Sequence, residues 1–369
     1  MRGAGFRAGS PLRGDELNQA PRDGRPKVAA ELVEALVLRK AKHGITLQWS
    51  GVACPARVRR PYRHRLDGNE QEMGGGLHGR SMHGPACDTV GMDIRATYHR
   101  LIETIEDAGT LAFAYFNANE SANELKDDGS VVTKVDQEIE TRLLAFINQQ
   151  FPDDAIVGEE HGSKDGTSGF VWHVDPIDGT DNFIRKIPFC AVSVARLGDT
   201  AEDSFGIVHN PFTRQTFSSL MDEGVYENEH VHNLTADPLG GRYVISIGRG
   251  KTEEWMRPAG FALQKELAVA FGKCHAYGSS ALELAYVAAN RIDAYLTFGL
   301  KSYDYAAGLF LVASAGGAIS VFEEGAWRRW TGSLKELCST HERIIFASHP
   351  DIHAKMLDFI GDPHAWADR

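Results

Sequence analysis

An apolar run that stops abruptly in two carboxylates constrains this chain more than any other feature. Residues 170 to 183 read Phe-Val-Trp-His-Val-Asp-Pro-Ile-Asp-Gly-Thr-Asp-Asn-Phe. Pro176 restricts itself and Asp175 to extended or turn conformations, so we expect the strand to end where the acidic residues begin. Asp175 and Asp178 would then project into one cleft. Carboxylates this close repel each other unless a cation lies between them, and hard oxygen ligands favour Mg²⁺.

The two residues after these carboxylates favour a bound anion. Gly179 lets the backbone come close to a ligand. A short helix beginning near Thr180 would direct free N–H groups and the positive end of its dipole toward a phosphate. The alternative is a plain turn with a helix cap, because Asp, Pro and Gly are ordinary turn residues. The motif alone leaves both interpretations open.

Further acidic residues occur in three other segments. Residues 151 to 162 form a predicted short strand that ends in Glu159 and Glu160. Asp304 comes directly before a run of small, apolar, helix-forming residues, and Asp136 lies in Val-Val-Thr-Lys-Val-Asp-Gln, residues 131 to 137.

Together these segments resemble the inositol monophosphatase family of Mg²⁺-dependent phosphomonoesterases, whose signatures are G-E-E, D-P-[IL]-D-G-T-x-N-[FY] and W-D-x-A-A-G. The resemblance runs from about Met92 to the C-terminus. It implies an α+β fold, a layered α-β-α-β-α sandwich with the site where its two halves meet, commonly in a homodimer. It also implies two to three Mg²⁺ ions.

The resemblance assigns ligands residue by residue. Glu159, Asp175 and the Ile177 carbonyl would hold the first metal, whereas Asp175, Asp178 and Asp304 would hold the second. A third, weaker metal would use Glu159.

The same resemblance assigns the remaining roles. Thr180 and Asp136 would position the attacking water. Glu160 is interpreted either as a partner that orients a ligand or as a solvated residue, and the first interpretation is slightly favoured. The predicted substrate-binding residues are Asp178, Gly179, Thr180, Ser279, Ser280 and Lys301, and for Lys301 a solvated position at the rim of the pocket is the alternative.

Such a site supports hydrolysis of a phosphate monoester by a metal-activated water, without a phosphorylated residue. A cysteine nucleophile is not indicated, because Cys190 lies in an apolar run typical of a buried strand. The histidines have no zinc spacing, and His173 is interpreted as a sheet residue.

The identity of the alcohol is less constrained. Gly278-Ser-Ser-Ala-Leu-Glu resembles the substrate-side segment of inositol monophosphatases, which favours inositol 1-phosphate. However, Thr297 stands where inositol-processing members have an acidic residue, and Lys301-Ser-Tyr-Asp resembles K-P-Y-D of histidinol-phosphate phosphatases. Histidinol phosphate, fructose 1,6-bisphosphate and 3'-phosphonucleotides therefore remain alternatives. A different class, a protein-binding regulatory module, also remains open, because some bacterial members associate with the transcription machinery.

Charge divides the chain of 369 residues into two parts. Residues 1 to 91 contain 15 Lys and Arg against 9 Asp and Glu, which leaves 24 against 41 for the rest. Nucleic-acid binding is not expected from the acidic part, because it requires clustered basic residues. Five widely spaced cysteines indicate a reducing compartment, so a cytoplasmic location is expected. An interaction with membranes is not expected, because the apolar runs are too short to span one.

The composition and the hydrophobic pattern of the sequence predict three regions. Residues 1–91, rich in Gly, Arg and Pro, are expected to be a disordered extension, so that Met92 is the functional start. Residues 92–235 would form the metal-binding and phosphate-binding half, and 236–369 the half that completes the site. Asp93 is a predicted helix cap. Strands are expected over 154–158, 170–174, 190–197 and 204–209, and helices over 281–290 and 305–315.

Overall fold

The computed structural model describes residues 93–118, 123–125, 131–220, 223–235, 242–249, 254–339 and 343–367. They belong to one compact unit, Thr89–Arg369. The extension predicted over residues 1–91 lies outside the described residues. Within the described ranges, no helix combines the length and the apolar character needed to cross a membrane.

The first layer of strands is an eight-stranded sheet in the order β10-β9-β8-β7-β6-β5-β3-β4. Its pairs are antiparallel except for β3 with β5. The strands are β3 (Ala155–Gly158), β4 (Ser163–Lys164), β5 (Val171–Asp178), β6 (Ala191–Leu197), β7 (Phe205–Asn210), β8 (Gln215–Leu220), β9 (Val225–Glu227) and β10 (His230–His232). A separate two-stranded sheet pairs β1 (Asn123–Leu125) with β2 (Val131–Thr133).

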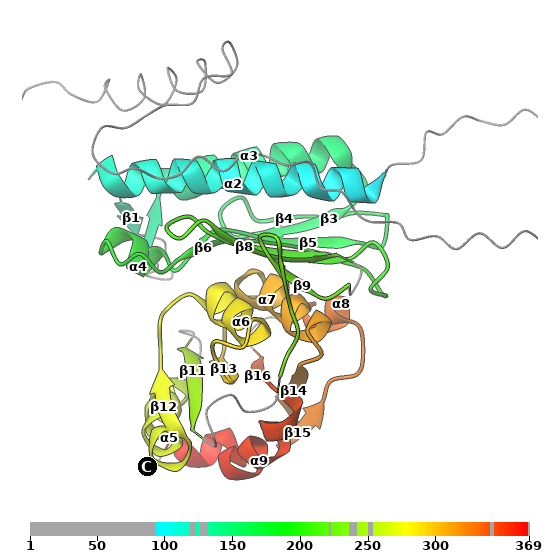
Figure 1. Ribbon diagram of the computed structural model, residues 1–369. Coiled ribbons are helices and arrows are strands. Elements are labelled where there is room, and N and C mark those ends of the chain that lie inside the picture. The colour runs from blue at the N-terminus through cyan, green and yellow to red at the C-terminus, as the bar shows by residue number, and fades with distance from the viewer. Residues whose placement is uncertain are drawn as a thin grey trace, which may run out of the picture. The chain divides into compact units, whose positions relative to one another are not determined.

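Two long helices, α2 (Ile94–Ala118) and α3 (Lys134–Gln150), cover the outer face of this sheet (Figure 1). The predicted cap is confirmed, because Asp93 Oδ1 accepts hydrogen bonds from the backbone N–H groups of Arg95 at 3.1 Å and Ala96 at 3.2 Å. Apolar residues at helical spacing face the sheet and are fully buried: Leu101, Ile105, Ile139, Leu143 and Ile147.

The second sheet has six strands in the order β12-β11-β13-β16-β14-β15. Its strands are β11 (Tyr243–Arg249), β12 (Gly272–His275), β13 (Ala294–Phe298), β14 (Ala318–Glu323), β15 (Ala326–Arg329) and β16 (Ile344–Ser348). The other helices are α4 (Thr180–Ile184), α5 (Met256–Phe271), α6 (Ser280–Ala288), α7 (Ser302–Ser314), α8 (Leu334–Leu337), α9 (Pro350–Ile360) and the 3₁₀ helix η1 (Pro363–Trp366).

Helices α6 and α7 lie between the two sheets, and α5 and α9 lie on the far side of the second sheet (Figure 1). One apolar core joins α6 and α7 to strands of both sheets, and a second core packs α5 and α9 on β11, β13 and β16. The order of layers is therefore α-β-α-β-α, which confirms the predicted α+β fold.

The prediction that the strand would end at Asp175 is wrong. Strand β5 continues to Asp178, with an irregularity in which Asp175 pairs with Ser193 and Asp178 with Ala191. Three steps along β5 therefore oppose two along β6, which is a β-bulge. Pro176 lies inside it, where a residue without an N–H is tolerated. The bulge changes the alternation of side chains so that two aspartates three residues apart can share one side.

The other predicted elements are confirmed to within a few residues, with one shift that affects the site. Helix α7 begins at Ser302, so Asp304 lies in its first turn and not before it. The predicted short helix begins at Thr180 as expected. His173 lies buried within β5, where its Nδ1 is 3.1 Å from Ser302 Oγ, so the sheet interpretation of this histidine is confirmed.

Candidate metal centre

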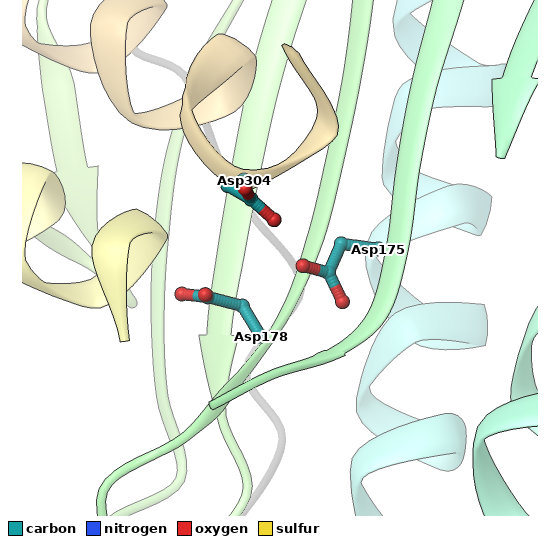
Figure 2. A group of neighbouring side chains, drawn as sticks. All are labelled: Asp175, Asp178 and Asp304. Atoms are coloured by element: carbon teal, nitrogen blue, oxygen red, sulfur yellow. The ribbon is translucent and has the colours of Figure 1, made fainter. Parts of the chain in front are cut away.

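Three carboxylates from two elements converge where the bulge of β5 meets the start of α7. One oxygen each of Asp175, Asp178 and Asp304 lies within 4.8 Å of the others. Figure 2 shows the two β5 aspartates beside the turn of α7 that carries Asp304. Asp175 and Asp178 are buried. The long-range pairing of a strand end with a helix start thus brings together residues more than 120 positions apart.

The electrostatics of this group call for a cation. Burial raises the pKa of Asp175 well above its usual range, and the charges of Glu159, Asp178 and Asp304 raise it further. Burial likewise raises the pKa of Asp304, with Asp178 and Glu159 adding to the effect. Asp175 Oδ1 is buried and has no hydrogen-bond partner among the described residues. An all-oxygen donor set with an unpaired buried oxygen fits a hard divalent cation such as Mg²⁺.

Glu159 lies next to this group, immediately after β3. Its backbone N–H donates to Val174 O at 3.2 Å. Of the neighbouring charges that raise the pKa of Asp175, the charge of Glu159 has the largest effect. Glu159 is not one of the three residues that converge within 4.8 Å. The Ile177 carbonyl accepts a hydrogen bond of 3.0 Å from Thr180 Oγ1.

Glu140 of α3 holds the turn that carries Glu159, a contact that the sequence interpretation missed. Its buried Oε2 accepts hydrogen bonds from the backbone N–H groups of Glu160 at 2.8 Å and His161 at 3.1 Å. Its Oε1 packs so closely on Gly158 that a Cβ there would lie 2.0 Å away. A signal existed, because Glu140 follows Asp136 by one helical turn on the same buried face.

Asp136 is fully buried in the first turn of α3. Its Oδ2 accepts hydrogen bonds from the Thr133 backbone N–H at 2.9 Å and from the Thr133 hydroxyl, while Oδ1 has no partner in the described part of the chain. Burial raises the pKa of Asp136 to about 7, and the charges of Glu159 and Glu160 contribute. The carboxyl groups of Asp136, Glu159 and Glu160 are therefore close enough to affect one another's charge.

Cys190 is buried directly before β6, as the sequence predicts. Burial raises the pKa of its thiol, and the charges of Asp178 and Asp136 raise it further. Because a thiol rather than a thiolate is favoured here, Cys190 is unsuited to act as a nucleophile.

The predicted substrate-side segment, residues 278 to 281, contacts the end of β5 through hydrogen bonds and a close backbone approach. Asp178 Oδ2 accepts hydrogen bonds from Ser279 Oγ at 2.6 Å and from the Ala281 backbone N–H at 2.7 Å. Gly179 has a φ of 95°, and a Cβ at this position would lie 2.9 Å from Gly278 O. Only glycine fits this close crossing of two backbones without strain.

Ser280 and Lys301 lie at helix starts near the carboxylates. Ser280 is the first residue of α6 and is buried. The backbone N–H of Lys301 donates to Asp304 Oδ2 at 2.8 Å, which fixes this carboxylate at the start of α7. Thr297 is buried in β13, and its Oγ1 has no partner among the described residues.

A layered α+β fold with a largely buried carboxylate group, where the first sheet meets a helix of the central layer, defines a class of protein suited to hold divalent cations. The chain belongs to the inositol monophosphatase family, whose sequence profile matches residues 93–359. The family resemblance is thereby confirmed, over a range close to the one expected from the motifs.

Individual proteins are similar to the chain in sequence or in fold. The chain is 35% identical over 196 residues to the Nus factor SuhB of Haemophilus influenzae, an alignment that spans 53% of this chain and 73% of that protein. The extragenic suppressor protein SuhB of Bartonella henselae is similar in structure, with a TM-score of 0.61 and 23% identity over 74% of this chain and 99% of that one. An IMPase of Thermotoga maritima has a TM-score of 0.59 and 24% identity over 75% and 97%.

Proposed function

We propose that the protein is a Mg²⁺-dependent phosphatase that hydrolyses a small polyol or sugar phosphate monoester, with inositol 1-phosphate as the first candidate. The observation that carries the proposal is the convergence of Asp175, Asp178 and Asp304 within 4.8 Å, with a buried oxygen of Asp175 left unpaired. Membership of the inositol monophosphatase family supports it.

Glu159, Asp175, Ile177, Asp178 and Asp304 would hold two to three ions, through carboxylates and the Ile177 carbonyl. Bound Mg²⁺ would supply an activated water and neutralise the charge of the phosphate and the leaving oxygen. The protein itself would supply fixed geometry. Two hydrogen bonds from the start of α6 orient Asp178, and the Lys301 backbone N–H orients Asp304.

Asp136 and Thr180 would orient the attacking water. The Thr180 hydroxyl donates its hydrogen to Ile177 O, so its oxygen lone pairs are left to accept a hydrogen bond from water. Asp136 Oδ1 has no hydrogen-bond partner in the described part of the chain, so this oxygen is left to accept a hydrogen bond from the water.

The phosphate ester would lie against the interlocked loops at the ends of β5 and before α6. The proposed contacts are Asp178, Gly179, Thr180, Ser279, Ser280 and Lys301. Ser279 contributes through its hydrogen bond to Asp178, since its hydroxyl hydrogen is already donated there. By analogy with the family, we also propose that the working form is a homodimer.

The test is phosphate release by the full chain from inositol 1-phosphate, histidinol phosphate, fructose 1,6-bisphosphate and 3'-phosphoadenosine 5'-phosphate, with Mg²⁺ and with EDTA. We expect release that requires Mg²⁺ and is fastest with inositol 1-phosphate. Faster release from histidinol phosphate would instead favour the alternative based on the resemblance of Lys301-Ser-Tyr-Asp to the K-P-Y-D of histidinol-phosphate phosphatases. Folded protein that is inactive on every ester would overturn the proposal.

A protein-binding role is the second candidate, because the relative from Haemophilus influenzae is named a Nus factor. Substitution of a proposed metal ligand distinguishes the two functions. Asp304→Asn would abolish the phosphatase function but leave a purely protein-binding function intact in cells that depend on this chain.

A further inference from the structure

Glu283 in α6 is a buried carboxylate that the metal site does not use directly. Only 1% of its surface is exposed. Its Oε1 accepts hydrogen bonds from the Ser246 hydroxyl and from the Tyr277 backbone N–H, the latter at 2.9 Å. Its Oε2 is buried and has no hydrogen-bond partner among the described residues. Glu283 therefore ties the segment before α6 to strand β11 of the second sheet.

The same segment holds Asp178 on its other side. Ser279 Oγ and the Ala281 backbone N–H both donate to Asp178 Oδ2. Residues 277 to 281 are here called the clamp segment. This segment thus donates hydrogen bonds to Asp178 of the first sheet and to Glu283. Burial is the main cause that raises the pKa of Glu283 to about 7, and the charge of Asp178 contributes to this rise.

We propose that Glu283 and Ser246 are positioning residues of the metal centre: they fix the clamp segment and thereby set the orientation of the Asp178 carboxylate. This inference rests on the metal site of the proposed function. Asp178 Oδ2 is occupied by two donors, so the direction in which Asp178 presents its other oxygen depends on where those donors stand. When a residue that hydrogen-bonds to a metal ligand is substituted, metal affinity typically falls about 10-fold to 100-fold.

Ser348 in β16 provides a matched control. Ser246 and Ser348 are both fully buried in the second sheet. Ser348 Oγ is 2.7 Å from His353 Nδ1, and His353 Nε2 is 2.8 Å from Ser320 Oγ, so this network joins β16, α9 and β14 and does not include the clamp segment. Loss of either hydroxyl removes a buried hydrogen bond and lowers stability to a comparable degree. Only loss of the Ser246 hydroxyl is expected to change the metal site.

The experiment is a titration of Mn²⁺ into the full chain, followed by electron paramagnetic resonance, which requires no enzymatic activity. We expect Ser246→Ala to weaken Mn²⁺ binding about tenfold, in line with other outer-shell substitutions. Ser348→Ala should leave the Mn²⁺ affinity unchanged although its melting temperature falls. Equal Mn²⁺ affinities for Ser246→Ala and Ser348→Ala would overturn the inference.

A second pair of variants gives an independent answer. Glu283→Gln keeps an oxygen that can accept from Ser246 and Tyr277, whereas Glu283→Leu keeps similar bulk and removes it. Mn²⁺ affinity should be near that of the wild type for Gln and weaker by about tenfold or more for Leu. Equal affinities in both would refute the role of Glu283. Wild-type protein that binds no Mn²⁺ would overturn the proposed metal site itself, which is a distinguishable result.

Discussion

Asp136→Asn should stabilise the metal-free protein at alkaline pH while it removes activity. Ionised Asp136 is fully buried and close to the charges of Glu159 and Glu160, so its pKa is raised from 3.8 to about 7. A raised carboxyl pKa means that folding favours the protonated form. This group's contribution to stability is therefore complete below about pH 4 and is lost as the pH rises through 7.

The size of the effect follows from the same shift. About three pKa units correspond to about 4 kcal/mol, at 1.36 kcal/mol per unit. Asparagine keeps an oxygen that can accept from the Thr133 N–H and hydroxyl, but it buries an additional N–H₂ group, which costs about 1–3 kcal/mol if that group is unpaired. We expect a net gain of about 1–3 kcal/mol at pH 8, or roughly 2–10 °C in melting temperature.

The assay is thermal unfolding in EDTA at pH 5 and pH 8, with phosphate release measured on the same samples after Mg²⁺ is added. The variant should melt above the wild type at pH 8, and the difference should shrink at pH 5. A variant that is less stable than the wild type at pH 8, or that is equally stabilised at both pH values, would refute the argument from buried charge.

Three further predictions concern the metal, the backbone crossing and the distant core. Mg²⁺ at 100 times its Kd should stabilise the wild type by about 2.7 kcal/mol in thermal melts, because it binds only the folded state; indifference to Mg²⁺ would count against the carboxylate group. Gly179→Ala, which would approach Gly278 O, should lower kcat and melting temperature, whereas Gly224→Ala, at a φ of 89° in open space, should lower only the latter. Asp154→Ala should cost about 3–5 kcal/mol in denaturant unfolding, because the buried Arg196 guanidinium loses its carboxylate partner and keeps the hydrogen bond from Nη1 to Asp203 O, and unchanged stability would contradict this.

The sequence predicted the start of α2 and the strands that carry Glu159, Asp175 and Asp178 because those signals are local. Asp93 caps α2, Glu159 follows a short strand, and Asp175 and Asp178 end an apolar run. Each of these depends on a few neighbouring residues. The family resemblance then joined segments that no local argument connects, and Asp304 does lie beside the two β5 aspartates.

The residues that support these ligands could not be found in the same way. Glu140 binds backbone groups 20 and 21 positions away, and Ser246 binds Glu283 across 37 positions. The local hydrophobic pattern indicates that such residues are polar and buried, but it does not identify their hydrogen-bond partners. The bulge at Pro176 was missed because proline predicts interruption of a ladder, whereas pairing with β6 resumes at Asp178.

The role of the carboxylate group in metal-dependent hydrolysis is tested by comparing phosphate release by the wild type and by Asp304→Asn, at saturating inositol 1-phosphate over a range of Mg²⁺ concentrations. Asparagine keeps an oxygen for the Lys301 N–H, so the fold should persist. We expect Mg²⁺-dependent release by the wild type, and release by the variant slower by about two orders of magnitude or more, given several kcal/mol of transition-state stabilisation from the metal. Near-normal release by folded Asp304→Asn, or release by the wild type that persists in EDTA, would contradict this role.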